Sequence, residues 1–406
     1  MVIDKTVGNV QLMQRINRLK VLNFVRAKGQ SSRPEIVRIT GLSPSSVTNI
    51  VGFLLEKKLL MESGAVDTRE VGRKATVIQF NPAALQIVCV NIEAKKIDLA
   101  LTDLAGNALK TKELVLDPKK SEKESLERIK AEIMAIRSEY EADPVDLAGI
   151  GIALSGLVLN HNQLVLSSSM HWRGVALKEY FEQAFSLPVF VQNNSRTKAL
   201  WRLRQSKEEP EQNIIFLDLA MGVGIINFYD QRVNDAVIGE IGHTTVKKDG
   251  PLCFCGNHGC LEMMCSVDAI INQCSELLLQ NRCPVLKRVM SQASADTPDY
   301  EMILQAFHQG DPDIPAVLRE CGEYLGIALA NIISLFNPQQ ILINGDQLLT
   351  EESIYQTALA EADARVNELF SKSVRYEKVC IDTAEEIRGL ALYVSDQLFE
   401  LSGFTL

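Results

Sequence analysis

The sequence predicts an α/β protein in which a small basic head precedes a large acidic body. The first 84 residues hold 13 Lys and Arg against 6 Asp and Glu, a net charge of +7, and the rest of the 406-residue chain carries −16. From residue 87 onward, short apolar runs typical of buried strands alternate with helical segments, as in α/β proteins. The charge asymmetry indicates that the head, and not the body, meets a polyanion.

The apolar pattern places the main elements of the body. Buried strands are expected at residues 87–92, 147–152, 189–191, 214–219 and 340–343, and helices at 121–139 and 177–184. The longest apolar run, residues 325–336, is too short for a membrane span and contains Asn331 and Ser334. It therefore predicts a buried helix, and no membrane insertion is expected.

Composition and length set further limits. With 46% hydrophobic and 23% charged residues, the chain has the profile of a soluble globular protein, and its length predicts two or three domains of about 150 residues each. Residues 1–29 have no continuous apolar core of the kind found in signal peptides. Nine cysteines, an odd number, favour a reducing cytoplasm in which clustered thiols serve metal or redox chemistry.

The head has the pattern of a helix-turn-helix. Apolar residues three or four apart predict a first helix over residues 11–28. A second, short helix begins at the N-cap Ser32 and ends at Gly41, and a third begins at Ser43 and runs to Lys58. Helix, tight turn and helix in this order are typical of DNA-binding heads.

Two short apolar runs, residues 59–62 and 76–80, flank a basic segment at 66–74 and predict a β-wing. Short polar side chains at the start of the third helix suit base edges in the major groove, and the basic wing suits phosphates or a narrow minor groove. The alternative is a helical dimerisation module whose serines only cap helices. The predicted DNA contacts are Ser32, Arg33, Ser43, Ser45, Ser46, Thr48, Asn49, Arg73 and Lys74.

The strongest chemical signal in the body is a cluster of three thiols at Cys253, Cys255 and Cys260, with His243 ten residues upstream of the first. Tetrahedral zinc takes four nitrogen or sulfur ligands, and three cysteines with one histidine are a common closed set. His258 competes with His243 for the fourth position. Because the set needs no water ligand, the sequence predicts a structural zinc ion.

Polar residues near this cluster suit a polyol ligand. Asn193 and Asn194 follow a predicted strand, and Glu240 and Glu262 flank the cysteine segment on its two sides. Two glycine-bearing strand ends, residues 149–156 and 222–226, could each cradle a phosphate or could serve a steric purpose only.

Over nearly its whole length the chain resembles the ROK family of repressors, open reading frames and kinases, and in particular its Mlc/NagC-type sugar-responsive repressors. The resemblance rests on SRPEIVRITGLSPSSVTNIV and GRKA in the head, and on GIGIALSGLV, GEIGHTTV, CFCGNHGCLE and ISLFNPQQILING in the body. It implies a winged helix-turn-helix joined to a two-lobed body with the sugar kinase/actin-like (ribonuclease H-like) fold.

The resemblance also implies domain limits and site residues. The head would span 1–82, the first lobe 83–194 completed by 381–406, and the second lobe 195–380, which would carry the zinc site and the oligomer interface. Zinc would be bound by His243, Cys253, Cys255 and Cys260. Sugar contacts would come from Gly156, Asn193, Asn194, Glu240, His243 and Glu262.

Two departures from the family pattern separate repressor from kinase. Where ROK kinases wrap ATP phosphates with a glycine turn, this chain has Glu93 and Ala94, which remove the glycines and add a negative charge. Where the kinases carry a catalytic Asp, this chain has Asn194, an amide without useful basicity. We therefore expect no enzymatic activity; the alternative is a ROK-type carbohydrate kinase with an accessory DNA-binding head.

The sequence thus predicts a transcriptional repressor of sugar uptake or metabolism genes that binds a double-stranded DNA operator as a homodimer or tetramer. Its effector would be a sugar, a sugar phosphate or a sugar-transporter protein, and these options stay open. The segment 387–406 either packs on the head and transmits the signal or packs only within its lobe.

Overall fold

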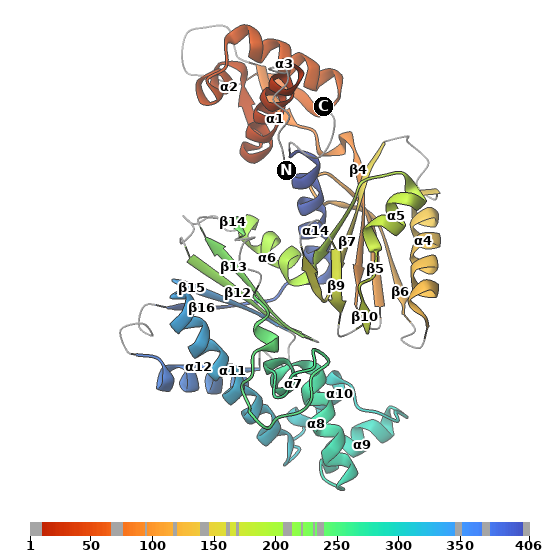
Figure 1. Cartoon of the computed structure of the whole chain (residues 1–406), viewed down its shortest axis with the longest axis vertical. Helices are drawn as coiled ribbons and strands as arrows, with labels where there is room; N and C mark the ends of the chain where they lie inside the picture. Colours follow the sequence, from red (N-terminus) through yellow and green to blue (C-terminus); the bar gives the residue numbers. More distant parts are fainter. Residues whose placement is uncertain are drawn as a thin grey trace. The chain divides into compact units, whose positions relative to one another are not determined.

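We describe the fold from a computed structural model of the chain (Figure 1). The residues that it describes are 10–65, 76–93, 96–116, 120–138, 146–159, 163–167, 170–205, 213–220, 222–229, 232–233, 239–345, 351–367 and 374–400. The chain divides into two compact units. Unit 1 comprises residues 1–153, 176–192 and 387–406, and unit 2 comprises residues 154–175 and 193–386.

The head, at the start of unit 1, contains three helices and a three-stranded antiparallel sheet in the order β1-β3-β2. The predicted helix-turn-helix is present as α2 and α3, and β2 and β3 form the hairpin of the predicted wing, whose tip lies outside the described residues. The elements are α1 (Val10–Lys28), β1 (Gln30–Ser32), α2 (Arg33–Thr40), α3 (Pro44–Glu56), β2 (Leu60–Ala65) and β3 (Thr76–Phe80).

Local sequence explains the turn between α2 and α3. Gly41 ends α2 in the left-handed conformation at φ 71°, where its N–H donates to the carbonyl of Val37. The Ser43 hydroxyl accepts the Ser46 N–H at 3.1 Å and so caps α3 as predicted, whereas Ser32 makes no side-chain cap bond. Val47, Val51 and Leu54 bury one face of α3 in the core of the head.

The body part of unit 1 is a five-stranded sheet in the order β11-β7-β4-β5-β6, in which β5 is antiparallel to both of its neighbours, β4 and β6. Helices α4 and α5 pack beside it (Figure 1). The central strand β4 is buried along its whole length, which explains its continuous apolar sequence. The elements are β4 (Gln86–Ile92), β5 (Lys96–Asp103), β6 (Ala108–Val115), α4 (Glu122–Ser138), β7 (Leu147–Leu154), α5 (Leu177–Phe185) and β11 (Val189–Asn193), after a short 3-10 turn η1 (Pro82–Ala84).

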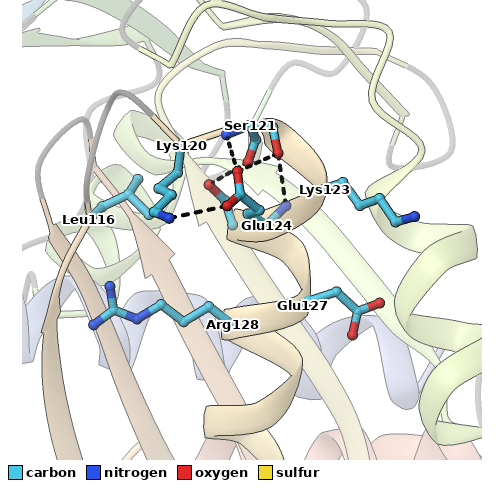
Figure 2. A pocket seen from close by; sticks show the side chains of 8 residues that line it. Leu116, Lys120, Ser121, Lys123, Glu124, Glu127 and Arg128 are labelled. Carbon is cyan, nitrogen blue, oxygen red and sulfur yellow. Dashed lines mark hydrogen bonds and ion pairs between the residues drawn. The ribbon is translucent and has the colours of Figure 1, made fainter.

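Helix α4 begins with a capping box that no apolar pattern announces (Figure 2). The Ser121 N–H donates to the Glu124 carboxylate at 3.0 Å, and the Glu124 N–H donates to the Ser121 hydroxyl at 3.3 Å. Hydrogen bonds to the Glu124 carboxylate from the Ser121 N–H, the Ser121 hydroxyl and Lys120 lower the pKa of Glu124 to about 2. Ser121 and Glu124, which line the pocket drawn in Figure 2, thus serve to cap the N-terminus of α4.

The last helix, α14 (Thr383–Leu398), contacts the first helix of the head. Arg26 of α1 forms an ion pair with Asp396 and donates to the carbonyl of Ser395 at 3.2 Å, while Asn23 donates to the carbonyl of Phe399 at 3.2 Å. The Phe399 ring meets the Phe80 ring edge to face, with centroids 6.3 Å apart, and is 1% exposed. A buried aromatic and an Arg side chain with two acceptors therefore fix the C-terminal turn of α14 on the head.

Unit 2 is built on a mixed five-stranded sheet in the order β14-β13-β12-β15-β16, in which β12, β15 and β16 are parallel. Alternate residues of β12 face opposite sides. Ile215, Leu217 and Leu219 join the core formed with α11, and Ile214 and Phe216 join the core that includes Ala199 of α6. The strands are β12 (Asn213–Leu219), β13 (Val223–Tyr229), β14 (Arg232–Val233), β15 (Gln340–Gly345) and β16 (Arg375–Val379).

The helices of unit 2 include α11, which covers the segment predicted at 325–336 but begins eleven residues earlier, and α12 beside it (Figure 1). A separate small sheet, β10-β9-β8, also belongs to this unit. The remaining elements are β8 (Leu157–Leu159), β9 (Gln163–Ser167), β10 (Trp172–Arg173), α6 (Asn194–Gln205), η2 (Ile241–His243), α7 (Leu261–Cys265), α8 (Val267–Leu279), α9 (Pro284–Gln292), α10 (Tyr300–His308), α11 (Ile314–Phe336) and α12 (Glu352–Arg365).

The predicted α/β class is thus confirmed: both body sheets carry helices on their faces, and the head is a separate helical and β element. The predicted domain limits at 82, 194 and 380 stay predictions. Among the described residues, no helix is both long enough and apolar enough to cross a membrane.

Candidate functional site

The metal-binding group lies in unit 2, on the 3-10 turn η2 and on the loop that leads into α7. The ligand atoms of His243, Cys253, Cys255 and Cys260 all lie within 4.8 Å of one another. The Sγ atoms of Cys255 and Cys260 are 3.6 Å apart, and Cys253 Sγ is 3.6 Å from His243 Nδ1. Zn–S bonds of about 2.3 Å in a tetrahedral shell place sulfur atoms roughly 3.8 Å apart. The four residues could therefore bind a metal such as zinc.

Backbone hydrogen bonds shape the loop around this group. The Cys253 N–H donates to the carbonyl of Asn257 at 2.7 Å, and the Val246 N–H donates to the carbonyl of Gly259 at 2.9 Å. Gly259 has φ +63°, and a Cβ there would lie 1.6 Å from the carbonyl oxygen of Lys247, so no other residue fits. Gly259 thus lets the backbone of the cysteine segment approach the backbone at Lys247 closely.

The competing ligand His258 is not part of the group. Its Nδ1 lies 3.3 Å from the carbonyl oxygen of Gly250, and its side chain is exposed. Burial raises the pKa of the Cys260 thiol to about 12 and also raises that of Cys253. The pKa of Cys255 is lowered: burial acts against this, and the Asn257 N–H and the neighbouring thiols outweigh it.

The predicted sugar-contact residues all lie in unit 2 and form one connected set. The Asn193 amide donates to the carbonyl of Gly156 at 2.7 Å, and the side-chain oxygens of Asn193 and Asn194 both accept the Ser195 N–H, at 2.8 and 2.9 Å. The two asparagines thereby cap the first turn of α6, which ties its N-terminus to the Gly156 turn.

Glu262 joins this set to the metal-binding group, since it lies two residues after Cys260. A carboxylate oxygen of Glu262 accepts the Val223 N–H at 3.3 Å. A Cβ on Gly222 would lie 2.7 Å from that carboxylate and 3.8 Å from the Ser155 hydroxyl. The glycine strand end at 222–226, which the sequence offered as a phosphate cradle, therefore makes room for a carboxylate.

Glu240 and His243 complete the set on η2. The His243 N–H donates to the carbonyl of Glu240 at 3.0 Å, and a Cβ on Gly242 would lie 2.5 Å from the carbonyl oxygen of Val223. Desolvation raises the pKa of Glu240, and the charge of Glu262 acts in the same direction, while His243 opposes it. Amides, carboxylates and an imidazole thus lie around Gly156, Gly222 and Val223, with acceptors and donors in the mixture that a polyol needs.

A buried ion pair that sequence reasoning missed holds α6 in place. Lys198, one turn after Asn194, lies 3.3 Å from the Asp218 carboxylate of β12 and 3.9 Å from Glu386. The Asn344 amide of β15 donates to Asp218 at 2.6 Å, and Lys198, Asp218 and Asn344 are all less than 10% exposed. A single Lys in a helical segment carries no sequence signal for such a partner 20 residues away.

A second cluster of possible metal ligands consists of Cys283, Asp311 and Asp313. Its two carboxylates already accept hydrogen bonds from backbone N–H groups. Asp311 accepts the N–H groups of Val285, Leu286 and Asp313, and Asp313 accepts the Cys283 N–H at 2.8 Å and pairs with Arg282. The two carboxylates therefore cap the start of α9.

In the head, the predicted DNA-contact residues differ in their exposure and in the contacts that they already make within the protein. Ser45, Thr48 and Asn49 are exposed on the face of α3 opposite its buried residues. Ser43 is used as the cap of α3, Ser46 and Ser32 are half-buried, and the Arg33 guanidinium pairs with Glu62 of β2 at 2.9 Å. Arg73 and Lys74 lie outside the described residues.

Comparison with known proteins gives the family. The model of the ROK family matches residues 87–396, so the chain belongs to the ROK family. It is 27% identical to the xylose repressor of Bacillus spizizenii over 89% of this chain and 90% of that protein. It is also 27% identical to the DNA-binding transcriptional repressor Mlc of Escherichia coli, over 98% of this chain and 97% of that protein.

Solved structures agree. The crystal structure of a ROK family transcriptional regulator, described as a homologue of the E. coli Mlc protein, covers 96% of this chain and 97% of its own, with 26% identity and a TM-score of 0.76. A ROK glucokinase from Streptomyces griseus shares the fold of the body alone, with 23% identity, a TM-score of 0.62 and 75% of this chain covered. Because the likeness to the repressors includes the head, this chain is a transcriptional repressor of the ROK family with a sugar-kinase-like body.

Metal analysis of variants tests the four-ligand group. The purified protein is expected to contain one zinc ion per chain by plasma mass spectrometry. Cys255→Ser removes a ligand, and we expect its zinc affinity to fall by about tenfold or more. Cys380→Ser is the matched control, because Cys380 is also exposed but lies outside the group. Equal zinc content in both variants would contradict the assignment.

Proposed function

We propose that this protein represses genes of sugar uptake or metabolism by binding an operator through its head, and that an effector at the body relieves repression. One observation carries the proposal: a single chain combines two features. The basic head has a helix with an exposed polar face, and the acidic body has a connected set of polar residues of the kind that bind sugars. The likeness to a xylose repressor and to Mlc over both parts supports it.

For the DNA interface we propose that α3 enters the major groove. Ser45, Thr48 and Asn49 present hydroxyl and amide groups on its outward face, next to Gly52, whose lack of a side chain permits close approach. Ser32, Arg33, Ser43, Ser46, Arg73 and Lys74 belong to the same proposed interface. A palindromic operator read by a homodimer or tetramer fits a head of this size.

For the metal we propose structural zinc bound by His243, Cys253, Cys255 and Cys260. The set contains no carboxylate and needs no water to complete four ligands, which is typical of closed sites. Bound zinc would hold η2 and the start of α7 together, and with them Glu240 and Glu262. None of the nine cysteines, all of which lie among the described residues, forms a disulfide, which fits a reducing cytoplasm.

For the effector we propose a sugar or sugar phosphate contacted by Gly156, Asn193, Asn194, Glu240, His243 and Glu262. A sugar-transporter protein acting on the body is the other source of regulation that the family resemblance implies. The contact of α14 with Arg26 and Asn23 supplies a route by which the body would change the position of the head.

We also propose that the protein has lost kinase chemistry. The side-chain oxygen of Asn194 accepts the Ser195 N–H, so this position serves as a helix cap, and an amide cannot take the proton of a sugar hydroxyl. Glu93 lies beside Lys96, with a carboxylate oxygen 3.9 Å from its ammonium, where the family's kinases place a glycine turn for phosphate; Ala94 is outside the described residues. The Val223 N–H at the second glycine turn donates to Glu262.

Operator binding tests the function directly. Selection from a random double-stranded DNA library should yield an inverted repeat, and anisotropy with that DNA should give Asn49→Ala a loss of roughly 1–3 kcal/mol, about 5- to 150-fold in affinity. Met13→Ala, an exposed and uncharged position on α1, should bind normally. Arg73→Ala should reduce the slope of log affinity against log salt by about 1. Recovery of no common sequence would contradict the proposal.

An ATP-coupled assay tests the loss of kinase chemistry. We expect no turnover of D-xylose, D-glucose or N-acetylglucosamine by the wild type. Asn194→Asp should stay inactive too, because it restores a base but not the phosphate turn. Turnover of any of these sugars by the wild type would make the protein a kinase instead.

A further inference from the structure

We propose that Phe254 is a positioning residue that couples the metal-binding loop to the small sheet β10-β9-β8, and through this sheet to the Gly156 end of the effector site. The inference deepens the proposed function of that site and rests on it for the effect on sugar binding, but not for the structural coupling.

Phe254 occupies an unusual place, between the two metal ligands Cys253 and Cys255. Its ring is 40% exposed, yet it contacts β10 and the residue before it. The ring centroids of Phe254 and His171 are 5.3 Å apart, and the Arg173 guanidinium lies 5.7 Å from the Phe254 centroid. Ligands on both sides fix the backbone of Phe254 when metal is bound, so the ring becomes a fixed support.

The sheet that receives this contact needs support. Its strands have three, five and two residues, so two of the three are shorter than the usual length of about five or six residues and offer few ladder hydrogen bonds. His171 has φ +53°, a conformation that a non-glycine residue keeps only where its surroundings hold it. Trp172 is 5% exposed and anchors β10 in the core. Phe254 contacts the two residues next to it in sequence, His171 and Arg173.

The sheet in turn fixes the Gly156 turn. Arg173 of β10 pairs with Leu166 of β9. A Cβ on Gly156 would lie 2.4 Å from the carbonyl oxygen of Leu166, and the Ser167 hydroxyl donates to the carbonyl of Ser155 at 2.5 Å. Gly156 then accepts from Asn193. Each step from Phe254 to the effector residue Asn193 is therefore a direct contact.

The metal thus has two connections to the effector site. One passes through His243, which is itself a ligand, and through Glu262, which lies two residues after the ligand Cys260. The other passes through Phe254 and the small sheet, and it can be cut without removing a ligand. Phe254→Ala deletes the ring, while Leu252→Ala is a matched control because Leu252 is an apolar residue of the same loop that is 62% exposed.

Hydrogen–deuterium exchange on the full-length, zinc-loaded protein tests the coupling. In Phe254→Ala we expect peptides covering 163–173 to exchange about 3- to 10-fold faster, with zinc content unchanged, since one ring contact is lost. Leu252→Ala should exchange like the wild type, and Phe254→Tyr should restore slow exchange. Chelation of zinc should accelerate the same peptides in the wild type and add little in Phe254→Ala. If the peptides covering 163–173 exchange at the same rate in Phe254→Ala as in the wild type, the inference is overturned.

Titration calorimetry with D-xylose, D-glucose and N-acetylglucosamine and their phosphates then tests the consequence for binding. For whichever ligand the wild type binds, Phe254→Ala should raise Kd about 3- to 10-fold, and Leu252→Ala should leave Kd unchanged. If the wild type binds none of them, the proposed effector fails, and the exchange experiment alone decides the role of Phe254. An unchanged Kd together with faster exchange would overturn the link to the effector site.

Discussion

The convergence of one imidazole and three thiols within 4.8 Å is the constraint on which the proposed effector site of unit 2 depends. The loop that carries these groups has little apolar packing of its own: Leu252 and Phe254 are both exposed, and Gly256 and Gly259 have positive φ. Ordering such a segment costs much conformational entropy, so a strong local interaction is needed to hold its conformation. Four metal bonds would supply that stabilisation at the point where Glu240, His243 and Glu262 meet.

The rest of the site is fixed by polar connections in addition to the apolar core of unit 2, which Val223, Ile241 and Leu261 join. Asn193 and Asn194 cap α6, and Lys198 on the same helix reaches the buried carboxylate of Asp218. Removing either partner of such a buried pair leaves an uncompensated charge, so the pair fixes the register of α6 on β12. The polar groups of the proposed effector site are thus positioned by other polar groups of the chain.

The two signs of charge in the chain match its two tasks. The head, which contains the exposed face of α3, carries a net charge of +7, and the body carries the excess of carboxylates. Yet the head is not electrostatically isolated, because Arg26 is paired with Asp396 of the last helix, which lies outside the count of +7, whereas the partner of Arg33, Glu62, is already included in it. Some of the basic residues that suggest DNA binding therefore hold the protein together, and the count of +7 overstates the charge free to meet phosphate.

Much of the fold follows from local sequence, because its elements carry local signals. The strands β4, β7, β12 and β15 are largely apolar runs, and Gly41 and Ser43 mark the turn of the helix-turn-helix. Helix α11 was predicted too short, since Arg319, Glu320 and Glu323 interrupt its apolar run, although the helix buries Val317, Leu318 and Cys321 between them.

The candidate site shows where sequence reasoning ends. The thiol spacing and the upstream His243 predicted the metal group, because ligand spacing is local. The contacts of Phe254 with His171 and of Lys198 with Asp218 join segments far apart in the chain, and neither residue differs in the sequence from an ordinary surface residue. Such contacts depend on tertiary packing: the first joins the metal-binding loop to the small sheet, and the second holds α6 on β12.

X-ray absorption at the zinc edge tests the central claim most directly. The account predicts three sulfur atoms at about 2.3 Å and one nitrogen at about 2.0–2.1 Å around a single zinc ion, without an oxygen ligand. A shell rich in oxygen, or one with fewer than three sulfur atoms, would contradict a closed centre made of His243, Cys253, Cys255 and Cys260.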